Sequence, residues 1–160
     1  MSKPTRILFV CLGNIIRSPL AEQLFSDLSR QAGVADNYTV DSAGTGDWHA
    51  GESPDPRMVE TAAKHGLTLG GTARQVRPVD LDSFDLILTM DESNRAGLLE
   101  LARNPANRGK IRMLREFDPQ RDDLEVPDPW YGGRGDFEQT YQIIERSVRG
   151  LLEALERGEV

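Results

Sequence analysis

Two short apolar runs constrain the fold of this chain more than any other feature. The segments RILFV (residues 6–10) and FDLILTM (residues 84–90) are almost continuously apolar, which is typical of strands buried on both faces of a parallel sheet. Two further β-rich runs, YTVDS (38–42) and KIRML (110–114), complete a set of four predicted strands. Helical patterns lie between them. Strands that alternate with helices indicate an α/β domain with a parallel sheet and right-handed crossovers.

The predicted helices are defined by apolar spacing and by the residues at their ends. Three helices are expected between or after the strands, over residues 18–31, 55–66 and 92–102. In the last part of the chain, Asp136 and Gln139 resemble a capping box. The apolar stripe that follows them predicts a long final helix, and Gly158 is suited to end it.

Length and charge exclude several classes of protein. The 160 residues suffice for one domain with a full core, and we expect a single domain over residues 1–160. The 26 acidic residues exceed the 19 lysines and arginines, giving a net charge of −7. This charge argues against nucleic acid or an anionic membrane as a partner. Any anion that the protein binds must therefore be held by local geometry.

Cysteine content and hydropathy indicate the compartment. Cys11 is the only cysteine, so no internal disulfide can form, and one cysteine with two histidines disfavours a zinc site. The N-terminal apolar run is too short for a secretory signal, and no stretch is long enough to span a bilayer. We expect a cytoplasmic, monomeric protein without a bound metal or other cofactor.

The loop after the first strand, in the segment VCLGNIIRSP, has the features of an anion site. Gly13 and Asn14 are the residues best able to adopt a positive φ, and a tight turn there can direct successive backbone N–H groups toward an anion. The following helix adds free N–H groups and the positive end of its dipole. Arg17 supplies a planar cation that matches two phosphate oxygens. The predicted phosphate-binding loop consists of Leu12, Gly13, Asn14, Ile15, Ile16, Arg17 and Ser18.

Cys11 lies at the carboxyl end of the first predicted strand, where ligands bind in parallel α/β sheets. A neighbouring cation and a helix N-terminus favour the thiolate form of a cysteine, which is its nucleophilic form. A buried structural cysteine beside a surface arginine is the alternative, because so short a pattern also recurs by chance. The position directly after a buried strand, with Ser-Pro beyond Arg17, favours a nucleophile.

The segment VCLGNIIRSP resembles the phosphate-binding signature of the low-molecular-weight protein tyrosine phosphatases, and DSAGT, DWHAG, ARQV, MDESN and DPWYGG follow in that family's order. The resemblance covers essentially the whole chain. It implies a flavodoxin-like three-layer α/β domain with a four-stranded parallel sheet flanked by helices, a phosphocysteine intermediate and no metal. It further implies that Cys11 is the nucleophile, Arg17 the phosphate clamp and Asp128 the general acid. Residues that would support the loop by hydrogen bonds are Asn14, Ser18 and Ser42.

Two long loops, residues 44–54 and 115–136, carry the other candidates. Asp128 lies between two prolines, which favour an extended backbone around it. A turn aspartate is the alternative, and the resemblance favours a general acid. The acids Asp41, Asp91 and Asp118 are interpreted as helix caps or surface charges. Aromatic residues in the two loops predict the walls of a slot for a phenyl ring, with His49 on its rim and the walls formed by Trp48, Trp130 and Tyr131.

The predicted activity is that of a hydrolase, a protein phosphatase with an acid-phosphatase type of reaction. Its expected partners are phosphotyrosine-containing proteins, small aryl phosphates, and inorganic phosphate or similar oxyanions as product or inhibitor. The alternatives are a thiol-dependent arsenate reductase, which needs further cysteines, and a catalytically silent oxyanion-binding module. Two positions depart from the family. Ile16 stands where a second cysteine is often found, so oxidised Cys11 lacks a neighbouring thiol, and residues 70–72 lack a histidine that supports Asn14 in some relatives.

Overall fold

Four parallel strands form the centre of the protein in the computed structural model, which describes residues 3–160. The strands run in the order β2-β1-β3-β4. Cys11, the last residue of β1, is paired with Gly44 of β2, and Val10 is paired with Thr89 of β3. The four predicted strands are confirmed, and their bounds are β1 Thr5–Cys11, β2 Tyr38–Gly44, β3 Leu86–Thr89 and β4 Ile111–Met113.

Six α-helices lie within residues 3–160, and four of them confirm the predicted helices. Those four are α1 Arg17–Gln31, α2 Pro56–Lys64, α4 Glu92–Leu101 and α6 Arg134–Glu156. The remaining two were not predicted because they are too short to show a helical period in the sequence. They are α3 Pro78–Ser83 and α5 Pro105–Arg108, and two 3₁₀ turns, η1 Ala35–Asn37 and η2 Leu114–Phe117, complete the elements.

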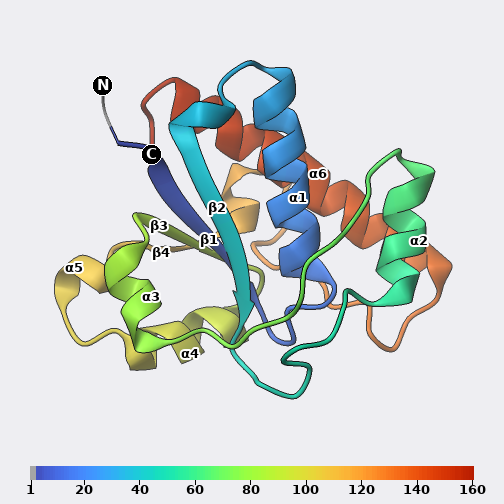
Figure 1. The fold of residues 1–160 in the computed structure, drawn as a ribbon, viewed down its shortest axis with the longest axis horizontal. Coiled ribbons are helices and arrows are strands. Elements are labelled where there is room, and N and C mark those ends of the chain that lie inside the picture. Colours follow the sequence, from blue (N-terminus) through green and yellow to red (C-terminus); the bar gives the residue numbers. More distant parts are fainter. Residues whose placement is uncertain (1–2) are drawn as a thin grey trace.

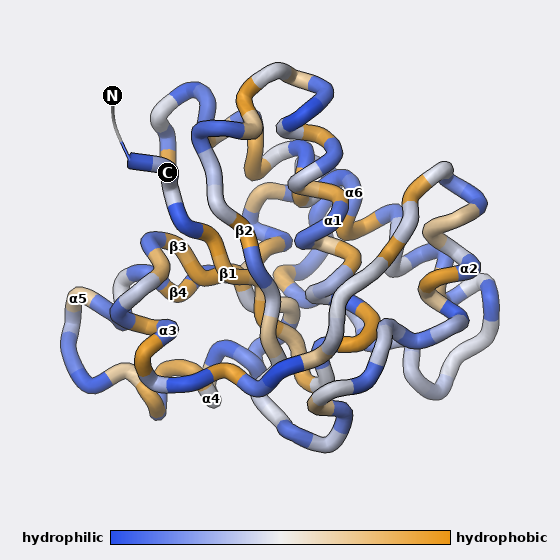
Figure 2. Tube along the Cα trace, in the orientation of Figure 1, coloured by the Kyte–Doolittle hydropathy of each residue, from blue (hydrophilic) through white to orange (hydrophobic). Residues whose placement is uncertain are grey.

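Helices cover both faces of the sheet, with α1, α2 and α6 on one side and α3, α4 and α5 on the other (Figure 1). Alternate residues of β1 pack against the helices on opposite faces of the sheet, because successive side chains of a strand point to opposite faces. Ile7 and Phe9 belong to the larger apolar cluster with α1 and α6, whereas Leu8 and Val10 belong to the smaller one with α3 and α4. Strands β1 and β3 are accordingly apolar along most of their length, whereas β2 is more polar (Figure 2). The predicted flavodoxin-like three-layer fold is confirmed.

The final helix ends as predicted but begins differently. The capping box expected at Asp136 and Gln139 is wrong. Helix α6 starts at Arg134, and the Asp136 carboxylate accepts a hydrogen bond from the Gly133 N–H at 2.9 Å. At the other end Gly158 has φ +70°, a conformation that glycine adopts without strain. No helix within residues 3–160 combines the length and apolarity of a membrane span.

Asp118 is a buried anchor of the loop that leads to residue 128, and its interpretation as a cap or surface charge is wrong. Its side chain is fully buried and accepts hydrogen bonds from Arg146 Nε at 3.0 Å and from Arg115 Nε at 3.2 Å. Burial raises the pKa of Asp118, but hydrogen bonds from Arg146, the Gln120 amide and Arg115 lower it more, so the pKa lies below its ordinary value. The charged form is thus favoured, and it ties the loop to α6.

Candidate active site

The loop between β1 and α1 turns tightly at Asn14, which has φ +58°. Gly13 and Asn14 were the residues judged best able to adopt a positive φ, and of the two only Asn14 does. At Gly13 a Cβ atom would lie 2.9 Å from His49 Cδ2, so a larger residue there would require the His49 ring to shift. Gly44 at the end of β2 also permits a close approach, because a Cβ there would lie 2.7 Å from the Leu12 carbonyl oxygen. The loop therefore packs closely against the long loop of residues 44–54 and against the end of β2.

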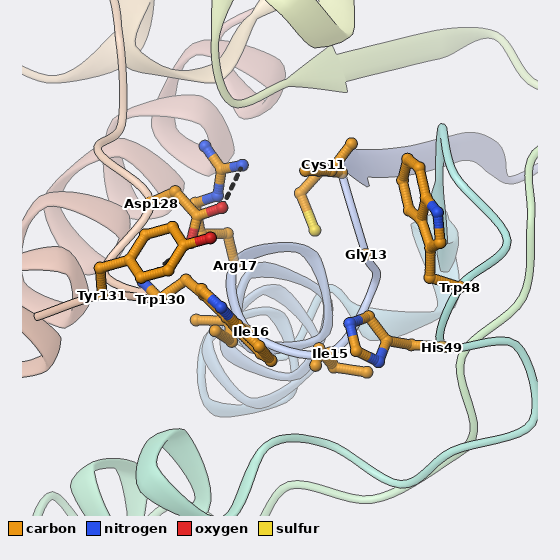
Figure 3. Close-up of a pocket in the computed structure, with 11 residues that line it drawn as sticks. Cys11, Gly13, Ile15, Ile16, Arg17, Trp48, His49, Asp128, Trp130 and Tyr131 are labelled. Atoms are coloured by element: carbon orange, nitrogen blue, oxygen red, sulfur yellow. Dashed lines mark hydrogen bonds and ion pairs between the residues drawn. The ribbon is translucent and has the colours of Figure 1, made fainter.

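Cys11 lines a cavity of about 420 Å³ even though only 2% of the residue is exposed. Its Sγ accepts a hydrogen bond from the Asn14 N–H at 3.3 Å and lies 3.0 Å from Ser18 Oγ. Figure 3 shows the sulfur pointing into the space between Arg17 and the aromatic side chains. The thiol is therefore directed toward the cavity, with the Asn14 N–H and the Ser18 hydroxyl beside it.

Asn14 holds the loop in place through hydrogen bonds of its amide group. Its Nδ2 donates to Ser18 Oγ at 2.7 Å and to Ser42 Oγ at 3.0 Å, and its Oδ1 accepts from the Arg74 N–H at 3.0 Å. Ser42 in turn donates to Glu22 at 2.6 Å. Burial raises the pKa of Glu22, and the hydrogen bond from Ser42 offsets this only in part. The structure thus brings together the three expected support residues, and the Arg74 backbone fixes the amide without a histidine.

Arg17 is the first residue of α1 and is 98% buried, with its guanidinium at the edge of the cavity. Nη1 donates to Asp91 Oδ2 at 2.8 Å and to the Val126 carbonyl oxygen at 2.9 Å, and Nη2 lies 3.5 Å from Asp128 Oδ2. Within residues 3–160, no side chain caps the start of α1, so the free N–H groups of its first turn face the same loop. The Arg17 guanidinium and the N–H groups at the start of α1 are therefore local donors for an anion, in a chain whose net charge is −7.

Asp91 has a role that sequence reasoning missed. It caps α4 as expected, accepting from the Asn94 N–H at 2.8 Å, and its second carboxylate oxygen orients Arg17. The available signal was positional. Asp91 follows β3, and the carboxyl ends of neighbouring parallel strands meet at one edge of the sheet. The contact of Arg17 with the Val126 carbonyl oxygen could not be predicted from the sequence, because any residue type can supply a backbone oxygen.

Asp128, on the loop between η2 and α6, lies beside Arg17 on the same side of the cavity (Figure 3). Its Oδ1 accepts a hydrogen bond from the Trp130 N–H at 3.1 Å, which fixes the orientation of the carboxyl group. The side chain remains 37% exposed. Cys11, Arg17 and Asp128 therefore meet at one cavity, although Asp128 lies far along the chain from the segment that carries Cys11 and Arg17 (Figure 3).

Aromatic side chains stand on two sides of the cavity. Trp48 lies on one side, and Trp130 and Tyr131 lie on the other (Figure 3). The Trp48 ring lies so close over Gly46 that a Cβ there would clash with it. His49 is on the rim as expected, with its ring centroid 5.5 Å from that of Trp130. Tyr131 is 98% exposed, so it forms the outer edge of the opening. The other lining residues from the loop are Leu12, Gly13, Ile15 and Ile16.

The site offers ligands for an anion. Within residues 3–160 no group of three or more histidine, cysteine, aspartate or glutamate side chains is placed to share a metal ion. The groups that converge are backbone amides, a guanidinium, a thiol and a carboxyl group. This combination suits the transfer of a phosphoryl group by positioning and charge stabilisation.

Comparisons with known proteins agree with this geometry. A family model described as low molecular weight phosphotyrosine protein phosphatase matches residues 6–160. A relative of that name from Sus scrofa is 45% identical over 148 residues, covering 92% of this chain and 93% of the relative. The low molecular weight protein-tyrosine-phosphatase of Streptomyces coelicolor is 42% identical over 152 residues, covering 94% and 93%. A crystal structure of a protein tyrosine phosphatase from Entamoeba histolytica superimposes with a TM-score of 0.93 at 35% identity, covering 98% of this chain and 99% of that one. The chain therefore belongs to the low molecular weight phosphotyrosine protein phosphatase family.

Proposed function

We propose that this protein hydrolyses phosphotyrosine in proteins, and small aryl phosphates, through a phosphocysteine intermediate on Cys11. The observation that carries the proposal is the meeting of the Cys11 thiol, the Arg17 guanidinium and the Asp128 carboxyl group at one cavity. A nucleophile, an oxyanion clamp and a proton donor are the three groups that transfer of a phosphoryl group to a thiol requires.

In the first step the Cys11 thiolate attacks phosphorus in line with the departing tyrosine oxygen. An S–P bond forms, the P–O bond to tyrosine breaks, and Asp128 gives its proton to the leaving oxygen. Amides of residues 12–17 and the Arg17 guanidinium hold the three equatorial oxygens, on which the charge of the transition state is spread. Arg17 Nη2 lies 3.5 Å from Asp128 Oδ2. The arginine that holds the phosphate and the acid that protonates the leaving oxygen are therefore close enough to act on one bound substrate.

In the second step a water molecule attacks phosphocysteine. Asp128, now a carboxylate, takes the proton from the water, the S–P bond breaks, and phosphate leaves. The departing thiolate receives hydrogen bonds from the Asn14 amide and from Ser18, which lies 3.0 Å from the sulfur. These two donors favour the negative sulfur both before the first step and after the second.

The depth of the site supports a choice of phosphotyrosine over shorter phosphoamino acids. Cys11 is 98% buried, at the base of a cavity whose proposed walls are the side chains of Trp48, Trp130 and Tyr131. A phenyl ring can reach the sulfur between these walls, whereas phosphoserine places its phosphate close to the peptide backbone. The same proposal treats residues 1–160 as one phosphatase domain that acts as a cytoplasmic monomer on phosphotyrosine-containing proteins, with inorganic phosphate as product and competitive inhibitor.

A set of matched phosphopeptides tests the proposed substrate. Each peptide carries phosphotyrosine, phosphoserine or phosphothreonine in one sequence, and phosphate release is measured. We expect kcat/KM for phosphotyrosine to exceed the other two by at least about 100-fold, because only the aryl ester reaches Cys11. Similar values for all three peptides, or activity confined to small phosphate esters, would contradict the proposal.

Asp128→Asn tests the proposed general acid. We expect kcat/KM to fall by about 10²–10³-fold for phenyl phosphate and phosphotyrosine, whose leaving groups need a proton, and by much less for p-nitrophenyl phosphate. The matched control is Asp47→Asn, an exposed carboxylate in the opposite loop, for which we expect wild-type values. Equal losses of kcat/KM for good and poor leaving groups would exclude Asp128 as the proton donor.

A further inference from the structure

The start of α2 contacts the phosphate-binding loop. The Asp55 N–H donates to the Ile15 carbonyl oxygen at 2.8 Å, so the residue that caps α2 is fixed to the loop around Cys11. The Asp55 side chain is only 7% exposed, and both of its oxygens accept from one arginine. Arg57 Nε lies 3.1 Å from Oδ1, and Nη2 lies 2.8 Å from Oδ2. This paired geometry fixes the plane of the guanidinium.

The remaining terminal nitrogen of Arg57 reaches the loop that carries Asp128. Nη1 donates to the Trp130 carbonyl oxygen at 2.8 Å. The guanidinium carbon lies 5.1 Å from the Trp130 ring centroid and 4.7 Å from that of Phe137, both within the range of cation–π contacts. The cation is thus held by one carboxylate, one carbonyl and two aromatic rings, and it joins α2 to the loop before α6.

Trp130 transmits this contact to the proposed acid. Its carbonyl oxygen accepts from Arg57, and its N–H donates to Asp128 Oδ1 at 3.1 Å. The same residue supplies one aromatic wall of the cavity (Figure 3). A shift of the Trp130 backbone would therefore move the Asp128 carboxyl group relative to Cys11.

Both members of the pair are charged at neutral pH. Hydrogen bonds to Asp55 raise the pKa of Arg57 more than desolvation lowers it. Burial raises the pKa of Asp55, but the hydrogen bonds from Arg57 lower it by more than burial raises it. The pKa of Asp55 therefore lies below its ordinary value. Arg57 is not one of the described residues that line the cavity, so its influence on substrate must pass through its neighbours.

We propose that Asp55 and Arg57 form a positioning pair, which fixes the distance between the phosphate-binding loop and Asp128 and so sets the efficiency of proton donation to the leaving group. This inference rests on the proposed function. Small displacements of a positioned group cost rate because proton transfer requires hydrogen-bond distance. The pair therefore acts on the step that involves the leaving group and leaves phosphate binding unchanged.

Arg57→Met tests the pair, because methionine keeps an unbranched apolar stem but has neither the charge nor the donors. We expect kcat/KM for phenyl phosphate to fall about tenfold, a part of the total contribution of a general acid, and that for p-nitrophenyl phosphate to change by less than about twofold. The inhibition constant of inorganic phosphate should stay at its wild-type value. Arg57→Lys, which keeps the charge and one donor, should restore part of the loss.

Arg134→Met is the matched control, since Arg134 also reaches α2 through Glu60, at 3.6 Å, but is 85% exposed. It should keep wild-type values for both substrates. A double-mutant cycle then separates positioning from general destabilisation. If Arg57 acts through Asp128, Arg57→Met should cost nothing more in an Asp128→Asn background.

The inference is overturned by a loss that is equal for both substrates, by a loss that persists in the Asp128→Asn background, or by weaker phosphate inhibition. If Arg57→Met fails to fold, Arg57→Lys decides the question through the same comparison of leaving groups. Failure of the proposed function itself has a different signature. In that case the wild-type protein would not hydrolyse aryl phosphates, or would do so without Cys11.

Discussion

Cys11→Ser is expected to lose essentially all hydrolysis of p-nitrophenyl phosphate, with kcat reduced by a factor on the order of 10⁴ or more, as for the removal of other enzymatic nucleophiles. A serine hydroxyl stays protonated in surroundings where a thiol can ionise, so the attacking group is lost. The chain has no second cysteine to take its place. The measurement is the steady-state release of p-nitrophenolate. The enzyme concentration is chosen so that a residual activity on the order of 10⁻⁵ of the wild-type activity is still detected, which covers the expected loss.

The same variant separates catalysis from binding. Serine preserves the hydrogen bond to Ser18 and the contact with the Asn14 amide, so titration calorimetry should give a phosphate affinity close to that of the wild-type protein. Hydrolysis retained by Cys11→Ser would refute the phosphocysteine mechanism. A wild-type protein that binds phosphate and phosphotyrosine without hydrolysing either would instead support the oxyanion-binding module considered from the sequence.

The strands and long helices could be predicted because each leaves a local pattern in the chain. Residues 7–11 of β1 are all buried, and a strand covered on both faces must be apolar throughout. Helix α6 spans 23 residues, enough for several repeats of an apolar stripe. Helices α3 and α5 have only six and four residues. Their positions depend on packing against the sheet, which no short window of sequence reveals.

The candidate site could be predicted where a single segment carries it. The segment from Cys11 to Ser18 places the sulfur, the turn and the guanidinium within eight consecutive residues, and the structure brings these groups to one cavity. The network around them comes from distant segments. Asp91 lies 74 residues from Arg17, and Arg57 lies 73 residues from Trp130. Asp118 was misjudged for a similar reason, because its burial depends on Arg146, a residue of α6.

Arg17→Lys is expected to reduce kcat/KM for p-nitrophenyl phosphate by a factor on the order of 10³, the lower range for an arginine that stabilises a phosphoryl transition state. Arg17 uses Nη1 to bind Asp91 and the Val126 carbonyl while Nη2 faces the cavity. Lysine has one nitrogen and cannot serve both sides with a rigid fork. The ammonium group is expected to remain on Asp91, which leaves the phosphate oxygens without their cation. Inhibition by inorganic phosphate should weaken in parallel.

Lysine is chosen over alanine because it keeps a positive charge beside Asp91, whose carboxylate would otherwise lose its partner in a largely buried site. A thermal melting curve close to that of the wild-type protein then assigns the lost activity to the missing fork. Arg95→Lys on α4 is the matched control, since Arg95 pairs with Glu92 at 3.0 Å on the surface, and it should keep full activity. Near wild-type kcat/KM and phosphate inhibition in Arg17→Lys would mean that a point charge suffices. The backbone amides of residues 12–17, together with the start of α1, would then be the main site of phosphate recognition.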